Sequence, residues 1–165
     1  MEETKSFASA ARSSGSVIPL EKGKIPPQAV DLEEAVLGAM LIDKKGVDEV
    51  IDILQAEAFY KTSHQYIFES IFELFEASEP IDLLTVSNDL KKKGKLEVAG
   101  GNPYLVSLTQ KVASSAHIEF HARIILQKHI QRSLIKISSE IIENSYKDSI
   151  DVFDLLDEAE SKLYD

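Results

Sequence analysis

The feature that most constrains the fold is a run from about Ala116 to Tyr146 that contains neither glycine nor proline. Glycine weakens a helix through its backbone freedom and proline through its missing amide hydrogen, so a run without either predicts one continuous helix. At 1.5 Å per residue this helix is about 45 Å long. That length exceeds the width of a small core, so part of the helix is expected to project from the molecule.

A second helix is predicted from Val152 to Leu163. Its expected apolar face consists of Val152, Leu156, Ala159 and Leu163. The connection over 147–150 is short, which favours an antiparallel helical hairpin over residues 116–165. The helical pattern continues to Asp165 without a C-terminal cap, so we expect the sequence to be the front part of a longer protein.

The long helix carries two apolar stripes, which lie roughly 100° or more apart when residues are placed at 100° intervals. The first stripe contains Leu126, Ile130, Leu134, Ile137 and Ile141. The second contains Ile124, Ile135, Ile142 and Tyr146. One short helix cannot cover both, so we expect the uncovered stripe to contact the globular part, another subunit or a different protein.

The remainder divides into a disordered tail, residues 1–24, and a helical globule, residues 25–112. The tail is rich in Ser, Ala, Gly and Lys and has no apolar period. In the globule, Asp31 with Glu34 fits an N-terminal capping pattern, and a short helix is expected over 47–54. The predicted fold class is therefore all-α: a compact globule followed by an extended antiparallel hairpin.

Three further helices are predicted in the globule. The first runs from Ser63 to about Ala77 and carries one apolar stripe. This stripe contains His64, Ile67, Phe68, Ile71, Phe72 and Phe75. Asp82 is expected to cap the next helix, with a hydrophobic staple between Ile81 and Val86. Asn102 is expected to cap the third, with Pro103 at its first position.

The charge balance argues against a nucleic-acid binder. The 165 residues contain 18 Lys and Arg against 28 Asp and Glu, a net charge of −10, and such a chain repels phosphate backbones at long range. Without cysteine there is no disulfide framework or thiolate nucleophile. No run of apolar residues is long enough for a membrane span, and the N-terminus lacks the pattern of a signal peptide, which by elimination predicts a cytoplasmic protein without membrane contact.

Sequence motifs for chemistry are weak. The Gly-Lys pairs at 23–24 and 94–95 lack the first glycine and the hydroxyl residue of a phosphate-binding loop. His117 and His121 are four residues apart but have no obvious third metal ligand, so we predict no metal site. His64 lies on an apolar helix face, where a hydrogen-bonded core histidine is the better interpretation than a catalytic one. No catalytic site is therefore expected.

The order of several short motifs resembles the N-terminal domain of the bacterial replicative DNA helicase, the DnaB family. The resemblance covers residues 25–165 and rests on Ile25-Pro26-Pro27, Ala35-Val36-Leu37-Gly38, Phe59-Tyr60 with His64 and Ile67-Phe68, Pro80-Ile81-Asp82-Leu83 with Thr85, Gly100-Gly101 with Tyr104-Leu105, and Ala122 with Ile124. Each motif alone is weak, whereas their order and spacing are specific.

The resemblance implies a non-catalytic collar domain that pairs subunits through helical hairpins, in assemblies from dimer to hexamer. It also implies docking of the primase C-terminal domain and contact with a helicase loader. ATP and Mg would belong to a C-terminal motor domain absent from this chain, which itself needs no cofactor. The predicted partner or subunit interface consists of Tyr104, Ile124, Ile135, Ile141, Ile142 and Tyr146.

Two other interpretations stay open. An unrelated all-α adaptor could dimerise through the same hairpin, and a small helical hydrolase could use His64. The acidic residues concentrate in the last segment, 148–165, with seven acids against one lysine. Because this segment is the suspected docking element, a basic protein surface is the expected complement.

Overall fold

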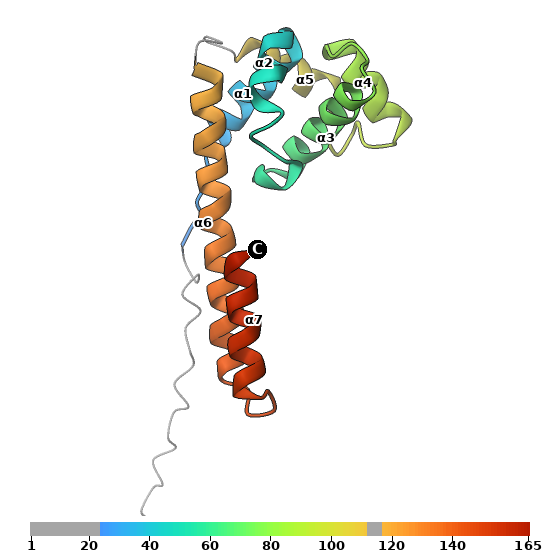
Figure 1. Cartoon of the computed structure of the whole chain (residues 1–165). Coiled ribbons are helices and arrows are strands. Elements are labelled where there is room, and N and C mark those ends of the chain that lie inside the picture. Colours follow the sequence, from blue (N-terminus) through green and yellow to red (C-terminus); the bar gives the residue numbers. More distant parts are fainter. Residues whose placement is uncertain (1–23, 112–116) are drawn as a thin grey trace, which may run out of the picture.

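The computed structural model describes residues 24–111 and 117–165, and within them the chain forms α-helices and one short 3-10 turn but no strand. The all-α prediction is confirmed. Apart from Lys24, the predicted tail lies outside the described residues. Figure 1 shows helices α1–α5 gathered around one end of α6, while the rest of α6 and all of α7 extend away from them.

The helices follow one another without long connections. Their bounds are α1 Val30–Ile42, α2 Lys44–Val50, the 3-10 turn Ala56–Ala58, α3 Thr62–Glu76, α4 Leu83–Lys92, α5 Gly101–Gln110, α6 Ile118–Ser145 and α7 Val152–Tyr164. Helix α1 is central, because it contacts α2, α3, α4, α5 and α6.

The core forms around α1, whose Leu37 and Met40 are fully buried against side chains such as Phe68 of α3. Helix α2 packs closely on the end of α1 at Gly46. A Cβ added there would lie 2.8 Å from the Ala39 carbonyl oxygen, a distance that forces the two helices apart. Glycine is therefore required for this helix contact.

Helices α3 and α4 lie where the sequence predicts them, each within one residue or so. The predicted cap of α4 is confirmed: the Thr85 amide donates to Asp82 Oδ1 and the Asp82 amide donates to Thr85 Oγ1, both at 2.9 Å. The predicted α3 stripe is correct at its start but wrong at its end. Phe72 and Phe75 are 37% and 38% exposed, and Leu74 is buried instead.

Three predicted helix starts are wrong. Helix α1 begins at Val30 after Ala29, without a side-chain cap, so Asp31 and Glu34 form no capping box. Helix α2 covers Lys44–Val50 rather than 47–54, because the Asp43 side chain caps it by accepting from the Lys45 amide. Helix α5 follows Gly100, which adopts a positive φ of 104°. Asn102 lies inside α5 and accepts a hydrogen bond from Ser87.

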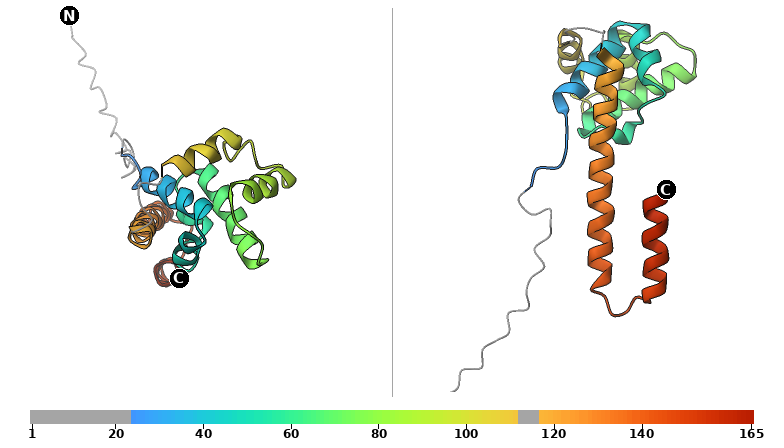
Figure 2. Two further views of the ribbon diagram at one scale, coloured as in Figure 1. Left: turned by 90° about the horizontal axis from the view of Figure 1, so that it is seen from above. Right: turned by 60° about the vertical axis from the view of Figure 1, so that its left-hand side comes forward.

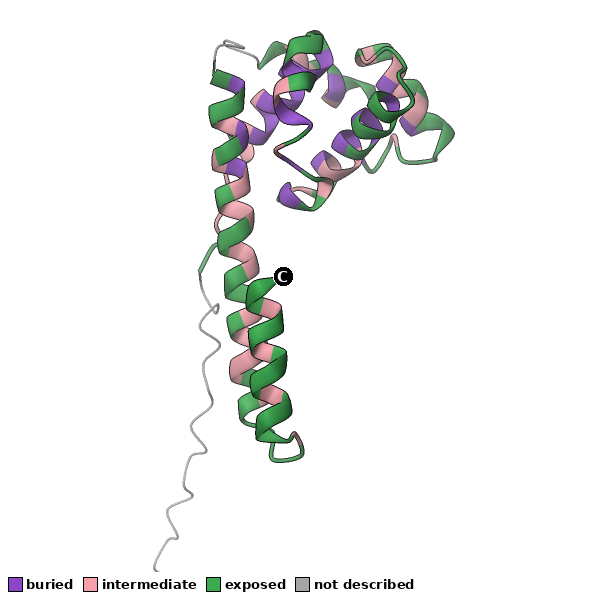
Figure 3. Ribbon diagram, viewed as in Figure 1, coloured by how far each residue is buried: buried purple, intermediate pink, exposed green. Residues whose placement is uncertain are grey.

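Helices α6 and α7 form the predicted antiparallel hairpin (Figure 2). Burial divides α6 into two parts, since its only buried residues, Ile118, Ala122 and Ile125, lie in its first two turns. They belong to neither predicted stripe and form a third face that packs into the globular core. In Figure 3 the buried residues cluster at the globule, and α7 has none. The first turns of α6 are thus part of the globule.

The face of α7 that packs on α6 differs from the prediction. Leu155, Ala159 and Lys162 are the partly buried residues of α7. Val152, Leu156 and Leu163, which were expected to face α6, are more than half exposed. Leu155 and Ala159 form the apolar part of the inward side, and at its end Lys162 Nζ pairs with Glu140 Oε2 of α6 at 3.0 Å.

Candidate docking and assembly surfaces

A buried polar cluster connects α1, α3 and α5. Glu33 of α1 is 1% exposed and His64 of α3 is fully buried. The His64 Nδ1 atom lies 2.8 Å from Glu33 Oε1, and the Tyr60 amide donates to Glu33 Oε2 at 2.8 Å. Both carboxyl oxygens of Glu33 thus have hydrogen-bond partners in the segment that leads into α3, as a buried polar group requires. The predicted core histidine is confirmed.

Tyr104 closes this cluster from α5. Its hydroxyl lies 2.5 Å from His64 Nε2, and Lys61 Nζ donates to the same hydroxyl at 3.4 Å. The Tyr104 and His64 rings stack with centroids 5.9 Å apart. Gly100 makes room for the tyrosine, because a Cβ there would lie 2.6 Å from the ring. All polar atoms of this cluster have partners, so its geometry supports a structural role rather than acid–base catalysis.

Arg132 holds the first described residues against α6. Its guanidinium donates to the carbonyl oxygens of Pro27 and Ala58, both at 2.8 Å. It also lies over the Tyr60 ring, 5.5 Å from the centroid. These contacts join the N-terminal segment, the end of the 3-10 turn and the middle of α6 at one point.

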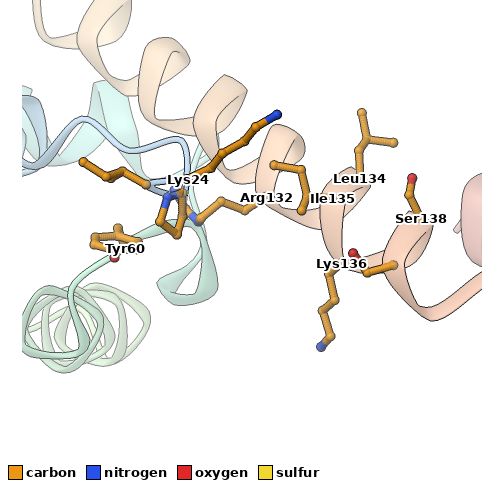
Figure 4. Close-up of a pocket in the computed structure, with 10 residues that line it drawn as sticks. Lys24, Tyr60, Arg132, Leu134, Ile135, Lys136 and Ser138 are labelled. Carbon is orange, nitrogen blue, oxygen red and sulfur yellow. The ribbon is translucent and has the colours of Figure 1, made fainter. Parts of the chain in front are cut away.

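A groove of about 770 Å³ opens next to Arg132, between the N-terminal segment and α6. Its lining is mostly apolar, from Ile25 and Pro26 on one side and Leu134 and Ile135 on the other. Figure 4 shows Arg132 close to Tyr60 at one end, with Leu134, Ile135 and Ser138 following along α6. Among the described residues this is an apolar surface without a covering segment.

A second uncovered apolar surface is the outer face of α7. It consists of Val152, Phe153, Leu156, Leu163 and Tyr164, which are between 55% and 90% exposed. Acidic residues flank it, and Asp151 also caps the helix by accepting from the Phe153 amide at 2.8 Å. An exposed apolar face with an acidic rim is typical of a protein-binding surface that selects a basic partner.

The predicted interface residues fall in different environments. Ile135 lines the groove, Tyr146 is 69% exposed near the end of α6, and Ile124 and Ile142 are partly buried. Tyr104 and Ile141 are also only partly buried. The structure gathers Ile135, Ile142 and Tyr146 on one side of α6, whereas Ile141 lies towards α7 and Tyr104 belongs to the buried cluster.

Glu33 and Arg132 are the residues that sequence reasoning missed. Both are charged side chains that belong to none of the predicted apolar stripes or interface residues. Arg132 lies in line with Ile118, Ala122, Ile125 and His129 at helical spacing. The signal that could have identified it was therefore that third face of α6.

Four lysines, Lys91, Lys92, Lys93 and Lys95, form a basic run at the end of α4. Two of them contact other residues of the globule. Lys93 pairs with Glu73 and with Asp89, and Lys95 lies over the Tyr66 ring at 5.0 Å. Burial by itself would raise the pKa of Asp89, but hydrogen bonds from Lys93 and Ser70 outweigh it and hold that pKa below its usual value. Lys93 and Lys95 are therefore engaged in contacts within the globule.

His117 and His121 lie one turn apart at the start of α6. The rings of His117 and His121 have centroids 6.5 Å apart, and residues 24–111 and 117–165 contain no cluster of three or more potential metal ligands. No helix among the same residues has the length and apolar character needed to span a bilayer.

The chain was compared with known protein families and solved structures. The model of the family described as DnaB-like helicase N terminal domain matches residues 25–127. The replicative DNA helicase DnaB of Rhodothermus marinus is 46% identical over 144 residues, and that of Geobacillus stearothermophilus is 39% identical over 142. These matches cover 87% and 85% of this chain but only 15% and 31% of those relatives.

Two solved structures are similar in fold. The crystal structure of the N-terminal domain of DnaB helicase from Mycobacterium tuberculosis has a TM-score of 0.80 at 32% identity, covering 85% of this chain and 99% of that one. A DnaB-like replicative helicase, described together with its interactions with primase, has a TM-score of 0.68 at 27% identity, covering 82% of this chain and 31% of that one. The chain therefore belongs to the DnaB-like helicase N-terminal domain family.

Proposed function

We propose that this chain is the assembly and docking domain of a hexameric replicative DNA helicase, acting in DNA replication without a catalytic site of its own. In this proposal its hairpins pair between subunits, and the domains together form a collar. The observation that carries the proposal is the hairpin itself. It projects beyond the globule with uncovered apolar surface on both α6 and α7, and apolar patches of this kind mark surfaces that bind another protein.

The charges of the two uncovered surfaces favour pairing between copies. The groove beside α6 has Lys24 and Lys136 in its lining, whereas the outer face of α7 is flanked by acids such as Asp154 and Asp157. Opposite charges on the two surfaces would orient one hairpin against the other. The proposed pairing is therefore expected to weaken as salt concentration rises.

The motor chemistry is assigned to other parts of the parent protein. The chain contains no Gly-rich loop ending in Gly-Lys-Ser or Gly-Lys-Thr, the motif whose backbone amides hold nucleotide phosphates. In the proposal, ATP and Mg bind in a C-terminal domain beyond these residues. A reading of the gene beyond Asp165 tests this directly: a phosphate loop some tens of residues on supports the helicase, and a stop codon contradicts it.

The proposed second partner is the C-terminal domain of primase, with a helicase loader as a further contact of the assembled ring. Support comes from the acidic rim of α7, which suits a basic protein surface, and from the relative that has been described with its interactions with primase. The rival interpretation, an unrelated all-α adaptor, predicts self-association without affinity for primase.

Self-association is tested by light scattering at micromolar concentration. We expect a dimer or a larger species, and a lower mass for the double variant Ile135→Asp with Ile142→Asp at unchanged helix content. A matched control, Gln127→Asp with Ser149→Asp, adds the same charge at exposed positions off the second stripe and should keep the wild-type mass. A monomeric wild type throughout this range contradicts hairpin pairing by the isolated domain.

Primase docking is tested by titrating the chain with the cognate primase C-terminal domain. We expect binding at or below tens of micromolar, and loss of binding for Leu156→Asp with Leu163→Asp on the outer face of α7. Absence of binding by the wild-type chain removes the docking role but leaves the assembly role intact, so the two parts of the proposal fail separately.

A further inference from the structure

The groove beside α6 lies where the described chain begins. Lys24, Ile25 and Pro26 line one of its sides, and Ile25 is 79% exposed. Across from them, Leu134 and Ile135 are 48% and 39% exposed. The groove thus carries apolar surface from two segments that no described segment covers, and burial of such surface favours binding of an apolar peptide.

The floor of the groove continues along α6 on the side away from α7. Ile135, Ile142 and Tyr146 fall within about 40° of one another on the helix, and Ile137 and Ile141, which lie towards α7, are on other faces. Figure 2 shows the segment between Lys24 and α1 running beside α6, with α7 on the other side. Followed backwards from α1, this segment runs away from the globule, towards Ile142 and Tyr146.

We propose that residues 17–20 of the same chain, Val-Ile-Pro-Leu, bind in this groove and its continuation. They are the longest apolar run that precedes Lys24. An extended chain spans at most about 3.6 Å per residue, so Leu20 can reach about 14 Å from Lys24. Tyr146 lies about 12 Å beyond Ser138 along the helix at 1.5 Å per residue. The run can therefore reach Ile142 and Tyr146, the part of the second stripe farthest from the globule, without full extension of residues 21–23.

The short tether favours the segment of the same chain over a second copy. Only residues 21–23 separate the run from the groove rim, and a short linker gives an effective concentration in the millimolar range. Weak contacts are then sufficient for occupancy. Pro19 limits the backbone entropy lost on binding, and Glu21 carries the charge opposite to that of Lys136 on the lining. The bound segment would compete with any partner that needs the second stripe.

The absence of cysteine from the chain permits a test by a single introduced disulfide in the full chain. Ser16→Cys with Ser145→Cys places one thiol beside the run and one beside Tyr146, and both changes are nearly isosteric. We expect this pair to form a disulfide within one chain about tenfold faster than the same pair combined with Ile18→Asp and Leu20→Asp, because docking raises the local thiol concentration.

A second pair controls for chance collisions. Ser161 lies exposed on α7, so Ser16→Cys with Ser161→Cys should react slowly and with no effect of the aspartates. Equal rates for the first pair with and without the aspartates overturn the proposal. Crosslinked dimers in which the thiol introduced at Ser16 of one copy is joined to the thiol introduced at Ser145 of another, identified by peptide mapping, also overturn it, because they place the run on a second copy. The proposal does not depend on helicase membership, and helix content measured by circular dichroism confirms folding of each variant.

Discussion

The globule and the hairpin are both helical, but they are stabilised differently. In the globule, α1 buries side chains on most of its surface and α3 buries one face, and together with α5 they enclose the Glu33–His64–Tyr104 cluster. In the hairpin, α7 has no buried residue and its contacts to α6 include one partly exposed ion pair, Lys162 with Glu140. The difference teaches that one part of the chain determines the fold, while the other offers apolar surface whose covering comes from elsewhere.

The largest effect is expected from truncating the core. Phe68 is 1% exposed and its ring packs 5.1 Å from that of Phe59, so Phe68→Ala should cost about 3–5 kcal/mol in the free energy of unfolding. Leu155→Ala in α7 should cost about 1 kcal/mol or less because the leucine is only partly buried. Urea unfolding followed by circular dichroism measures the loss in unfolding free energy for both variants. Equal losses would contradict the difference between globule and hairpin.

Changes in the Glu33–His64–Tyr104 cluster are expected to give the second-largest loss in the free energy of unfolding. His64→Ala removes the side-chain donor to buried Glu33, and leaving such a group unpaired should cost about 2–3 kcal/mol. Tyr104→Phe removes only one hydroxyl and should cost about 1 kcal/mol. The same urea titration compares the two variants. A His64→Ala protein as stable as the wild type would show that the cluster does not stabilise the globule.

Substitution of Arg132, which joins the hairpin helix α6 to the globule, is expected to give the third-largest loss in the free energy of unfolding. Arg132→Ala removes donors to the Pro27 and Ala58 carbonyls and should cost about 1–2 kcal/mol. Arg132→Lys keeps the charge but not the two-pronged geometry, so it should restore only part of the loss. Hydrogen exchange at Lys61, next to the Tyr60 ring, and at the first turns of α1 should speed up in both variants. No change in exchange would contradict the joining role.

One helix cap in the globule and one in the hairpin can be removed by the same type of substitution, so their effects can be compared directly. Asp82→Ala removes the cap of α4 and Asp151→Ala removes the cap of α7, and each cap contributes about 1 kcal/mol locally. We expect the first change to lower the unfolding midpoint of the whole protein. The second should lower helix content before the main transition. Identical behaviour of the two variants would show that hairpin and globule unfold as one unit.

The smallest expected effect is on the pH dependence of folding stability. Burial, together with the nearby charge of Arg132, lowers the pKa of His129 below its usual value of 6.5. The unfolded chain then binds more protons than the folded one just below pH 6.5, so stability should fall as pH falls through this window. His129→Gln should flatten this part of the stability profile. An unchanged profile would assign the pH dependence to other groups.

The helices of the globule were largely predictable because their apolar residues recur at helical spacing and because capping residues, glycines and prolines mark many of their ends. The α4 cap and the α3 period show this. The fully enclosed helix α1 was harder, since it has apolar neighbours on nearly all sides and no side-chain cap. Its Asp31 and Glu34 resembled a capping pattern, although the buried acid that matters is Glu33 of α1, whose carboxyl oxygens contact the Tyr60 amide and His64.

The two-stripe interpretation of α6 was right about excess apolar surface but did not identify how it is divided. The first turns use a third face, because residues such as Ala122 fit closely against the globule. Helical spacing reports which residues share a face, but not which neighbour each face meets. That choice depends on contacts between residues far apart in sequence, such as those of Arg132 with Pro27 and Ala58, and spacing does not encode them.

Arg132 lies where α6 leaves the globule. A small tilt of the helix at this point would therefore move the far end of the hairpin by a larger distance. The helix is held against the globule as far as Arg132 and continues for about 20 Å to Ser145 at 1.5 Å per residue. A tilt of about 10° at that point would move the hairpin loop by about 3–4 Å. Small rearrangements around one guanidinium would therefore displace the far end of the hairpin by several ångströms, and in the proposed pairing of hairpins they would change which residues meet there.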